Sequence, residues 1–144
     1  SHFSPNNTIP ALNIYRDLFE PSEQLAKPYA MLGLNVIAAD SDEEAEFLAT
    51  SSQQQFLSLR RGRPTPLKPP VSNLEEMCTP SELIAVKNTL TSGSTIVGSP
   101  ETVRRGLEDF IEKTNADELI IHTQIFDHEA RRRSYEIIAE FMEA

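Results

Sequence analysis

Cysteine, tryptophan and basic residues are scarce in this 144-residue sequence, which has one cysteine, no tryptophan and five glycines. The lone cysteine, Cys78, excludes an intramolecular disulfide and every metal or iron–sulfur site that needs several cysteines. Lysine and arginine together number 13 against 22 aspartates and glutamates, and this net charge of −9 argues against a general binder of nucleic acid or of anionic membranes. The longest apolar run, 29–39, is interrupted by Gly33 and Asn35 and is too short to cross a bilayer. No signal peptide is recognisable, so we expect a cytoplasmic protein.

The residues that are present indicate a globular domain in which strands alternate with helices. Apolar residues make up 39% and charged residues 24% of the chain, which is typical of folded proteins. Apolar runs followed by amphipathic stretches predict strand–helix units at about 28–60, 94–114 and 117–143. Strands that alternate with helices pair in parallel through right-handed crossovers, so the expected fold class is α/β with about three parallel strands.

Capping signals support the predicted helices. Ser41 followed by Glu44 forms a capping box at the start of the first long helix, and Thr79 followed by Glu82 repeats that pattern. Ser99 stands directly before a proline, which is common at the first position of a helix.

A proline-rich segment separates the first strand–helix unit from the second. Four of the ten prolines fall between 64 and 70, which excludes regular structure there. We expect an irregular insertion loop at 61–78 followed by a short helix, the two together spanning 61–91. A loop of this length in a compact domain is usually a lid, a binding loop or a disordered segment.

Three parallel strands make a poor sheet by themselves. We expect their helices to cover one face, which leaves the other face and both edges of the sheet apolar and unpaired. A (β/α)₈ barrel needs about 250 residues. The 1–144 pattern therefore predicts a single partial domain, the C-terminal part of such a TIM barrel.

Short motifs occur in one order along nearly the whole chain and indicate a family. They are Ser1-His2-Phe3, the segments 15–22, 28–31 and 35–40, Arg61-Gly62-Arg63-Pro64, and the segments 69–71, 97–103, 117–119, 127–131 and 134–135. Each motif is weak by itself. The ordered set resembles the C-terminal part of the bacterial-luciferase-like family of flavin-dependent monooxygenases.

The resemblance implies a barrel enzyme that uses reduced FMN, supplied by a reductase, and O₂ to oxidise a small organic substrate, with a deazaflavin as the alternative cofactor. It makes the strands at 29–39, 94–98 and 118–124 the sixth, seventh and eighth of the barrel. Ser1 and His2 would then follow the fifth strand, where family members receive the flavin phosphate. The family's first four strands, which carry most flavin-ring contacts and the catalytic residues, have no counterpart here, so we assign no catalytic residue.

Active-site residues of this fold lie at the carboxyl ends of the strands and in the loops that follow. His122 shares a strand face with Gln124, so the two are candidates for the substrate or flavin pocket, while His122 could equally be a polar strand-end residue with one satisfied hydrogen bond. Arg61 and Arg63 are candidates for a lid that meets an anionic cofactor tail or substrate, while favourable charge at a helix C-terminus is the simpler interpretation. Gly98 before Ser99 is a geometry that holds phosphate, although Ser99 also caps a helix without any ligand.

A metal site is not expected. The potential ligands His122, Asp127, His128 and Glu129 cross a strand–helix junction and lack a second cluster that would complete a coordination shell. Asp127 is better explained as a helix cap.

Three hypotheses of function follow. In the first, the chain is part of a flavin-dependent monooxygenase that is inactive without the missing N-terminal half. In the second, it is a non-catalytic half-barrel module that pairs with its own copy or another subunit. In the third, it belongs to a family member that binds flavin but does not oxygenate.

Overall fold

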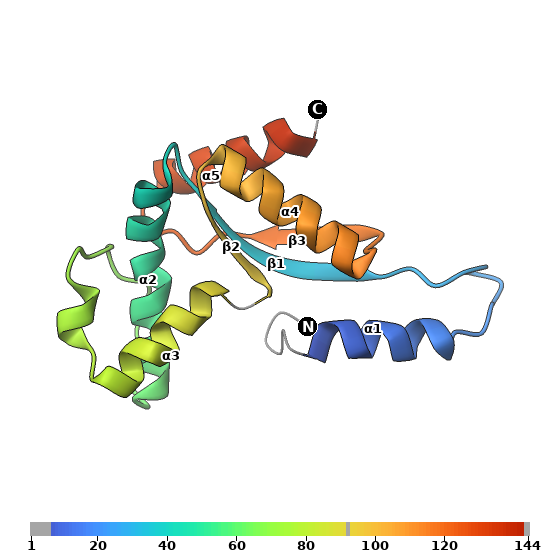
Figure 1. The fold of residues 1–144 in the computed structure, drawn as a ribbon, viewed down its shortest axis with the longest axis horizontal. Helices are drawn as coiled ribbons and strands as arrows, with labels where there is room; N and C mark the ends of the chain where they lie inside the picture. Colours follow the sequence, from blue (N-terminus) through green and yellow to red (C-terminus); the bar gives the residue numbers. More distant parts are fainter. Residues whose placement is uncertain (1–6, 92, 143–144) are drawn as a thin grey trace.

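The computed structural model describes residues 7–91 and 93–142 and contains one parallel sheet (Figure 1). Its strands are β1 (Met31–Ala38), β2 (Thr95–Gly98) and β3 (Glu118–His122), in the order β2-β1-β3. The first half of β1 pairs with β3 and the second half with β2, so that Asn35 is flanked by Thr95 on one side and His122 on the other. The expected α/β class with three parallel strands is confirmed.

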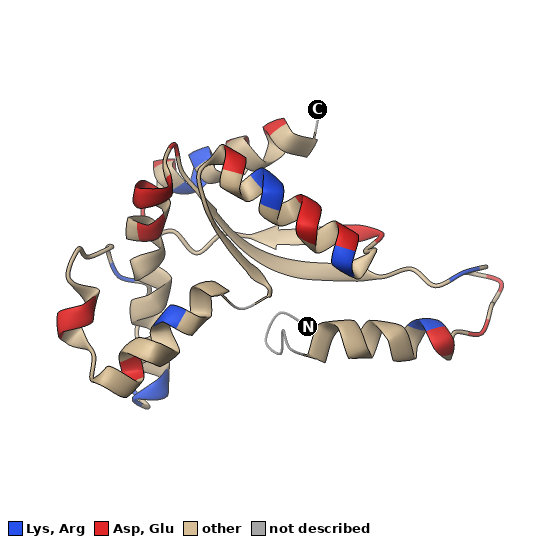
Figure 2. Cartoon of the chain, in the orientation of Figure 1, with Lys and Arg blue, Asp and Glu red and all other residues tan. Residues whose placement is uncertain are grey.

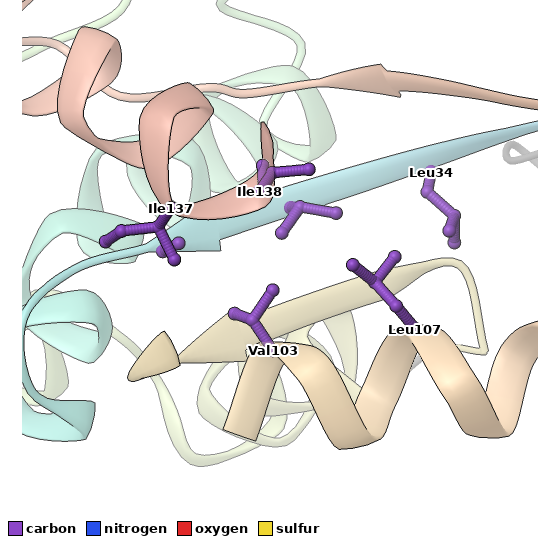
Figure 3. Packing of buried hydrophobic residues seen from close by; sticks show 7 residues of the cluster. Leu34, Val103, Leu107, Ile137 and Ile138 are labelled. Carbon is purple, nitrogen blue, oxygen red and sulfur yellow. The ribbon is translucent and has the colours of Figure 1, made fainter. Parts of the chain in front are cut away.

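Helices pack on both faces of the sheet. Leu34, Val36 and Ala38 point toward α4 (Pro100–Thr114) and α5 (His128–Met142), where they meet Val103, Leu107, Ile137 and Ile138 (Figure 3). Ile37 and Ala39 point the other way and pack against Ala45, Leu48 and Ala49 of α2 (Asp42–Arg60). The alternation follows from the two-residue period of a strand, and the nearly unbroken apolar run of β1 is what a strand covered on both faces requires.

This arrangement corrects two expectations. Consecutive barrel strands would put 94–98 between the other two strands, whereas β1 is central. The helices also cover two faces of the sheet rather than one. The two corrections have one cause: the chain moves one way across the sheet from β1 to β2 and the opposite way from β2 to β3. Right-handed crossovers in opposite directions place their helices on opposite faces.

The predicted caps are present. Ser41 Oγ accepts a hydrogen bond of 3.2 Å from the Glu44 amide. The Thr79 amide donates to Glu82 Oε2 at 2.8 Å, at the start of α3 (Pro80–Thr91). Ser99 Oγ accepts from the Thr102 amide at 3.4 Å. Local sequence therefore determines where these helices begin.

Two further elements complete the described chain. The helix α1 (Thr8–Asp17) is tied to the end of α4, because Arg16 Nη2 donates to the carbonyls of Thr114 and Asn115 at 2.8 and 2.7 Å. The expected loop is irregular except for one 3₁₀ turn, η2 (Leu74–Met77). Within the described ranges no helix combines the length and the apolar character that crossing a bilayer requires.

Candidate functional site

The carboxyl end of β1, at the edge of the sheet where the fold predicts a site, opens into a cleft of about 390 Å³. Its walls come from the end of β1, the start of α2 and the start of α5: Ala38, Ala39, Asp40, Glu44, Leu48, Glu129, Ala130, Arg132, Arg133 and Glu136. The chain leaves β1 over one face of the sheet and leaves β3 over the other. The cleft thus lies at the switch point of the topology, where open α/β sheets usually bind ligands.

Carboxylates outnumber cations in this cleft. Arg133 donates to Asp40 Oδ1 from Nε at 3.0 Å and from Nη2 at 2.9 Å, and this contact raises the pKa of the arginine. Arg132 is paired with Glu129 at 3.0 Å and with Glu136 at 3.5 Å. Figure 2 shows the acidic residues gathered on the first turn of α2. Since both arginines of the cleft are ion-paired, it presents no ready site for a phosphate dianion.

The turn at Gly98 and Ser99 already holds an anion, the carboxylate of Asp42. The Ser99 amide donates to Asp42 Oδ1 at 2.7 Å, and this hydrogen bond is the main cause that lowers the pKa of Asp42, with Thr102 and Ser99 hydroxyls assisting. A Cβ on Gly98 would lie 2.7 Å from the same oxygen. The side chain of Asp42, at the start of α2, therefore occupies the position in which the sequence suggested a phosphate.

Where β3 ends, two side-chain hydroxyls form hydrogen bonds with the backbone of β1. Thr123 Oγ1 donates to the Val36 carbonyl, and Ser134 Oγ accepts from the Ala38 amide at 3.0 Å. The two hydroxyls lie 3.3 Å apart and are buried. His122 lies one position earlier, beside Asn35 on β1, and does not line the cleft. Gln124 is exposed.

The predicted lid residues lie elsewhere. Arg61 makes a two-pronged contact with Glu82, from Nε to Oε1 and from Nη2 to Oε2, each 2.8 Å, and its Nη2 also donates to the Met77 carbonyl at 2.8 Å. Arg63 is exposed beyond the end of α2. The loop is fastened to α2, since the Val71 amide donates to Thr50 Oγ1 at 2.9 Å. No residue of 61–78 lines the cleft.

The remaining predicted residues, Ser1 and His2, lie outside the described residues, and their role stays a prediction. Within 7–91 and 93–142, no group of three or more His, Cys, Asp or Glu side chains is arranged to hold a metal ion.

Sequence analysis missed the roles of Asp42, Arg133 and Ser134. Asp42 directly follows the capping residue Ser41, so local sequence places it only at the start of its own helix and does not reveal its contact with Ser99, 57 positions away. Arg133 and Asp40 are 93 positions apart, so no local pattern connects them. An isolated serine inside an amphipathic helix was the one available signal for Ser134.

Three described positions that could receive a flavin phosphate do not fit it. The cleft is acidic, the turn at Gly98 is filled by Asp42, and Arg61 is committed to Glu82. None of these three positions therefore offers a ready contact for a flavin phosphate.

Comparison with known proteins identifies relatives along the whole chain. No protein-family model matches the sequence. The Bacillus subtilis protein YvbT, which is described as uncharacterized, is 51% identical over 140 residues, or 97% of this chain and 41% of YvbT. An Escherichia coli K12 protein named luciferase-like monooxygenase is 46% identical over 143 residues, or 99% of this chain and 42% of the relative.

Two solved structures share the fold. The crystal structure of apo-MsnO8 matches 99% of this chain with a TM-score of 0.85 and 29% identity. The monooxygenase RslO1 from Streptomyces bottropensis matches 96% with a TM-score of 0.57, and at 16% identity it shows the fold alone. The matches cover 43% of MsnO8 and 38% of RslO1. The chain thus spans about two fifths of the length of the proteins it resembles.

Proposed function

We propose that the whole protein is a flavin-dependent monooxygenase. The premise is that this chain belongs to the luciferase-like monooxygenase family, as a segment of about 42% of a relative's length. It would use reduced FMN and O₂ to oxidise a small organic substrate. The observation that carries this proposal is the 46% identity, over 99% of this chain, to a relative named luciferase-like monooxygenase.

The segment's own contribution is structural. The end of β1 and the starts of α2 and α5 line the cleft, and carboxylates already occupy the turn at Gly98 and both arginines of the cleft. We therefore assign flavin-phosphate binding to residues outside the described ranges, with Ser1 and His2 as candidates. The 144-residue chain alone should neither bind FMN nor turn over substrate.

A chimera tests the proposal in a full-length protein. The matched 143 residues of the E. coli relative are replaced by this chain, and FMN binding is followed by quenching of flavin fluorescence. The chimera should bind one FMN, and the isolated chain should bind none. A folded chimera that binds no FMN contradicts the proposal. If the chimera binds a deazaflavin and not FMN, the cofactor in the proposal is a deazaflavin instead of FMN.

Two substitutions in the chimera test the phosphate contacts. Ser1→Ala and His2→Ala should each raise the Kd for FMN about tenfold, because each removes a hydrogen bond to a charged group. Ser4→Ala is the matched control and should leave the Kd unchanged. Equal effects at all three positions would contradict the assignment to Ser1 and His2.

A further inference from the structure

A second concave site lies apart from the cleft, between α2, α3 and the loop that carries η2 (Figure 1). It is a groove of about 660 Å³, and no residue of the cleft lines it. Its apolar lining includes Leu74, Leu83, Val86 and Leu90. Small-molecule sites usually have volumes of about 300–1,000 Å³ and mostly apolar walls with a few polar groups. This site, called the α2–α3 groove below, therefore has the size and the lining of a small-molecule site.

The wall formed by the loop is held in place without a ligand. The Val71 amide donates to Thr50 Oγ1 at 2.9 Å, and Gln54 Nε2 donates to the Pro69 carbonyl at 2.8 Å. Both contacts fasten the loop to α2 beside the groove. Because the groove is already formed, a ligand would not have to order the loop in order to bind.

Two carboxylates give the rim of the groove a negative charge. Glu43 and Glu46 lie three positions apart on α2, are exposed, and form no ion pair with the described residues. Lys87 also lines the groove, but its ammonium group is paired with the Glu75 carboxylate at 2.8 Å. The charge that remains attracts a cationic group and repels a carboxylate or a phosphate.

A hydrogen-bond acceptor in the wall of the groove is an independent indication of a ligand. Gln53 lines the groove and is only 5% exposed. Its Nε2 donates to the Val86 carbonyl at 3.4 Å, whereas its Oε1 accepts no hydrogen bond from the described residues, without being fully enclosed. Since polar groups in the interior are normally matched by a partner, this oxygen is a position for an N–H of a ligand.

The spacing of these groups indicates the class of ligand. Glu46 and Gln53 are seven positions apart on α2, which separates them by about 10 Å along the helix axis. We propose that the α2–α3 groove binds a linear primary amine that carries a second N–H donor at about this distance from its ammonium group. The ammonium group lies at Glu43 and Glu46, the methylene chain packs on Val86 and Leu90, and the second N–H donates to Gln53 Oε1. The site is separate from the cleft, so its ligand does not depend on the proposed function.

Two probes that differ only in the charge of one end test the ligand class. The first is 6-acetamidohexylammonium, in which six methylenes separate an ammonium group from an amide N–H, and the second is 6-acetamidohexanoate. Isothermal titration calorimetry at low salt with this chain should give a Kd of about 1 mM for the ammonium compound. The carboxylate should bind at least about tenfold more weakly, because the rim repels it. Equal affinities for the two probes, or binding of neither, would overturn the proposal.

Substitution of the rim carboxylates tests the position of the ammonium group. The double variant Glu43→Gln with Glu46→Gln should bind 6-acetamidohexylammonium about threefold to tenfold more weakly, and 0.5 M salt should weaken binding to the parent chain about as much. Glu20→Gln with Glu112→Gln is the matched control, because it removes the same charge at exposed positions outside the groove. The same loss in both double variants would show that net charge, and not the rim, attracts the probe.

Gln53→Leu tests the second contact. It should weaken binding of 6-acetamidohexylammonium about fivefold but leave binding of hexylammonium, which has no amide, unchanged. Gln55→Leu, on the same helix but outside the groove, should change neither affinity. Equal losses for both compounds in Gln53→Leu would mean that the variant alters the shape of the groove, and would contradict the hydrogen bond to Gln53.

Parallel titrations of the chimera separate this inference from the proposed function. The chimera should bind 6-acetamidohexylammonium with the same Kd as this chain. Binding by this chain alone would mean that the rest of a luciferase-like chain covers the groove, which overturns the site. A dimer of this chain that dissociates as the amine is added would assign the groove to a second copy and also overturn it. A chimera that binds the amine but no FMN supports the groove and contradicts only the proposed function.

Discussion

The hydroxyl of Ser134 on α5 accepts a hydrogen bond of 3.0 Å from the backbone amide of Ala38 on β1. β3 pairs with β1 only as far as His122, opposite Asn35, so it supplies no carbonyl for this amide. A helix side chain thus replaces the missing strand partner at the place where the sheet opens into the cleft.

Ser134→Ala should lower the free energy of unfolding by about 1–3 kcal/mol, because the Ala38 amide is then buried without an acceptor. Ser51→Ala is the matched control: Ser51 is equally buried on a helix, and its hydroxyl has no partner within the described residues. That substitution should be neutral or stabilising. Urea unfolding measures both, and similar losses for the two variants would refute the role of Ser134.

Gly98→Ala should destabilise the protein by about 2 kcal/mol or more. Gly98 has φ +156, and a Cβ there would lie 2.5 Å from Thr102 Cγ2 and 2.7 Å from Asp42 Oδ1. The clash would separate the turn after β2 from the start of α2. Gly93→Ala is the control, since a Cβ at that position meets nothing within 4 Å. Equal unfolding midpoints for the two variants in urea would contradict this account of the turn.

The elements could be predicted from the sequence because their signals are local. Ser41 with Glu44 and Thr79 with Glu82 act as the caps that their spacing indicates. The apolar run 29–39 predicts a strand, and β1 occupies most of it. The central place of β1 in the sheet was not predicted, because the sequence pattern of an apolar run does not depend on which strands flank it.

The candidate site was predicted less completely, because its contacts are between distant residues. The strand-end rule points to the residues that follow each strand, and Asp40, which follows β1, lines the cleft. For Arg61, the sequence left two interpretations open: a contact with a ligand, or favourable charge at a helix end. In the structure its guanidinium instead binds the carboxylate of Glu82, 21 positions later. Sequence spacing carries no information about such a pairing across a loop.

Leu107→Ala should lower the free energy of unfolding by about 3 kcal/mol. Leu107 is 0% exposed and packs from α4 against Leu34 and its neighbours on β1 (Figure 3). Its truncation leaves a cavity between helix and sheet. Leu59→Ala, at a side chain 64% exposed, is the control and should change stability by less than about 0.5 kcal/mol. Comparable losses in urea unfolding would show that the α4 layer does not carry the core.

The last prediction concerns pH and the carboxylate of Glu82. Hydrogen bonds from Arg61 and the Thr79 amide lower its pKa from 4.5 to about 2. Because the folded pKa lies below the ordinary value, the stabilisation by Glu82 is fully present above about pH 4.5 and disappears as the pH falls toward 2. Glu82→Gln removes the charge at every pH, so its loss of stability relative to the parent protein should be largest near neutral pH and shrink on acidification.

Urea unfolding of the parent protein and Glu82→Gln between pH 7 and pH 3 measures this difference. Glu112→Gln, at an exposed position on α4, is the matched control and should show a small difference that does not change over the same range. Arg61→Leu should lose at least as much stability at neutral pH, because it removes the largest cause of the lowered pKa of Glu82 and also the hydrogen bond to the Met77 carbonyl. A difference for Glu82→Gln that stays constant or grows toward pH 3 would mean that the fork between Arg61 and Glu82 does not fasten the loop to α3 in solution.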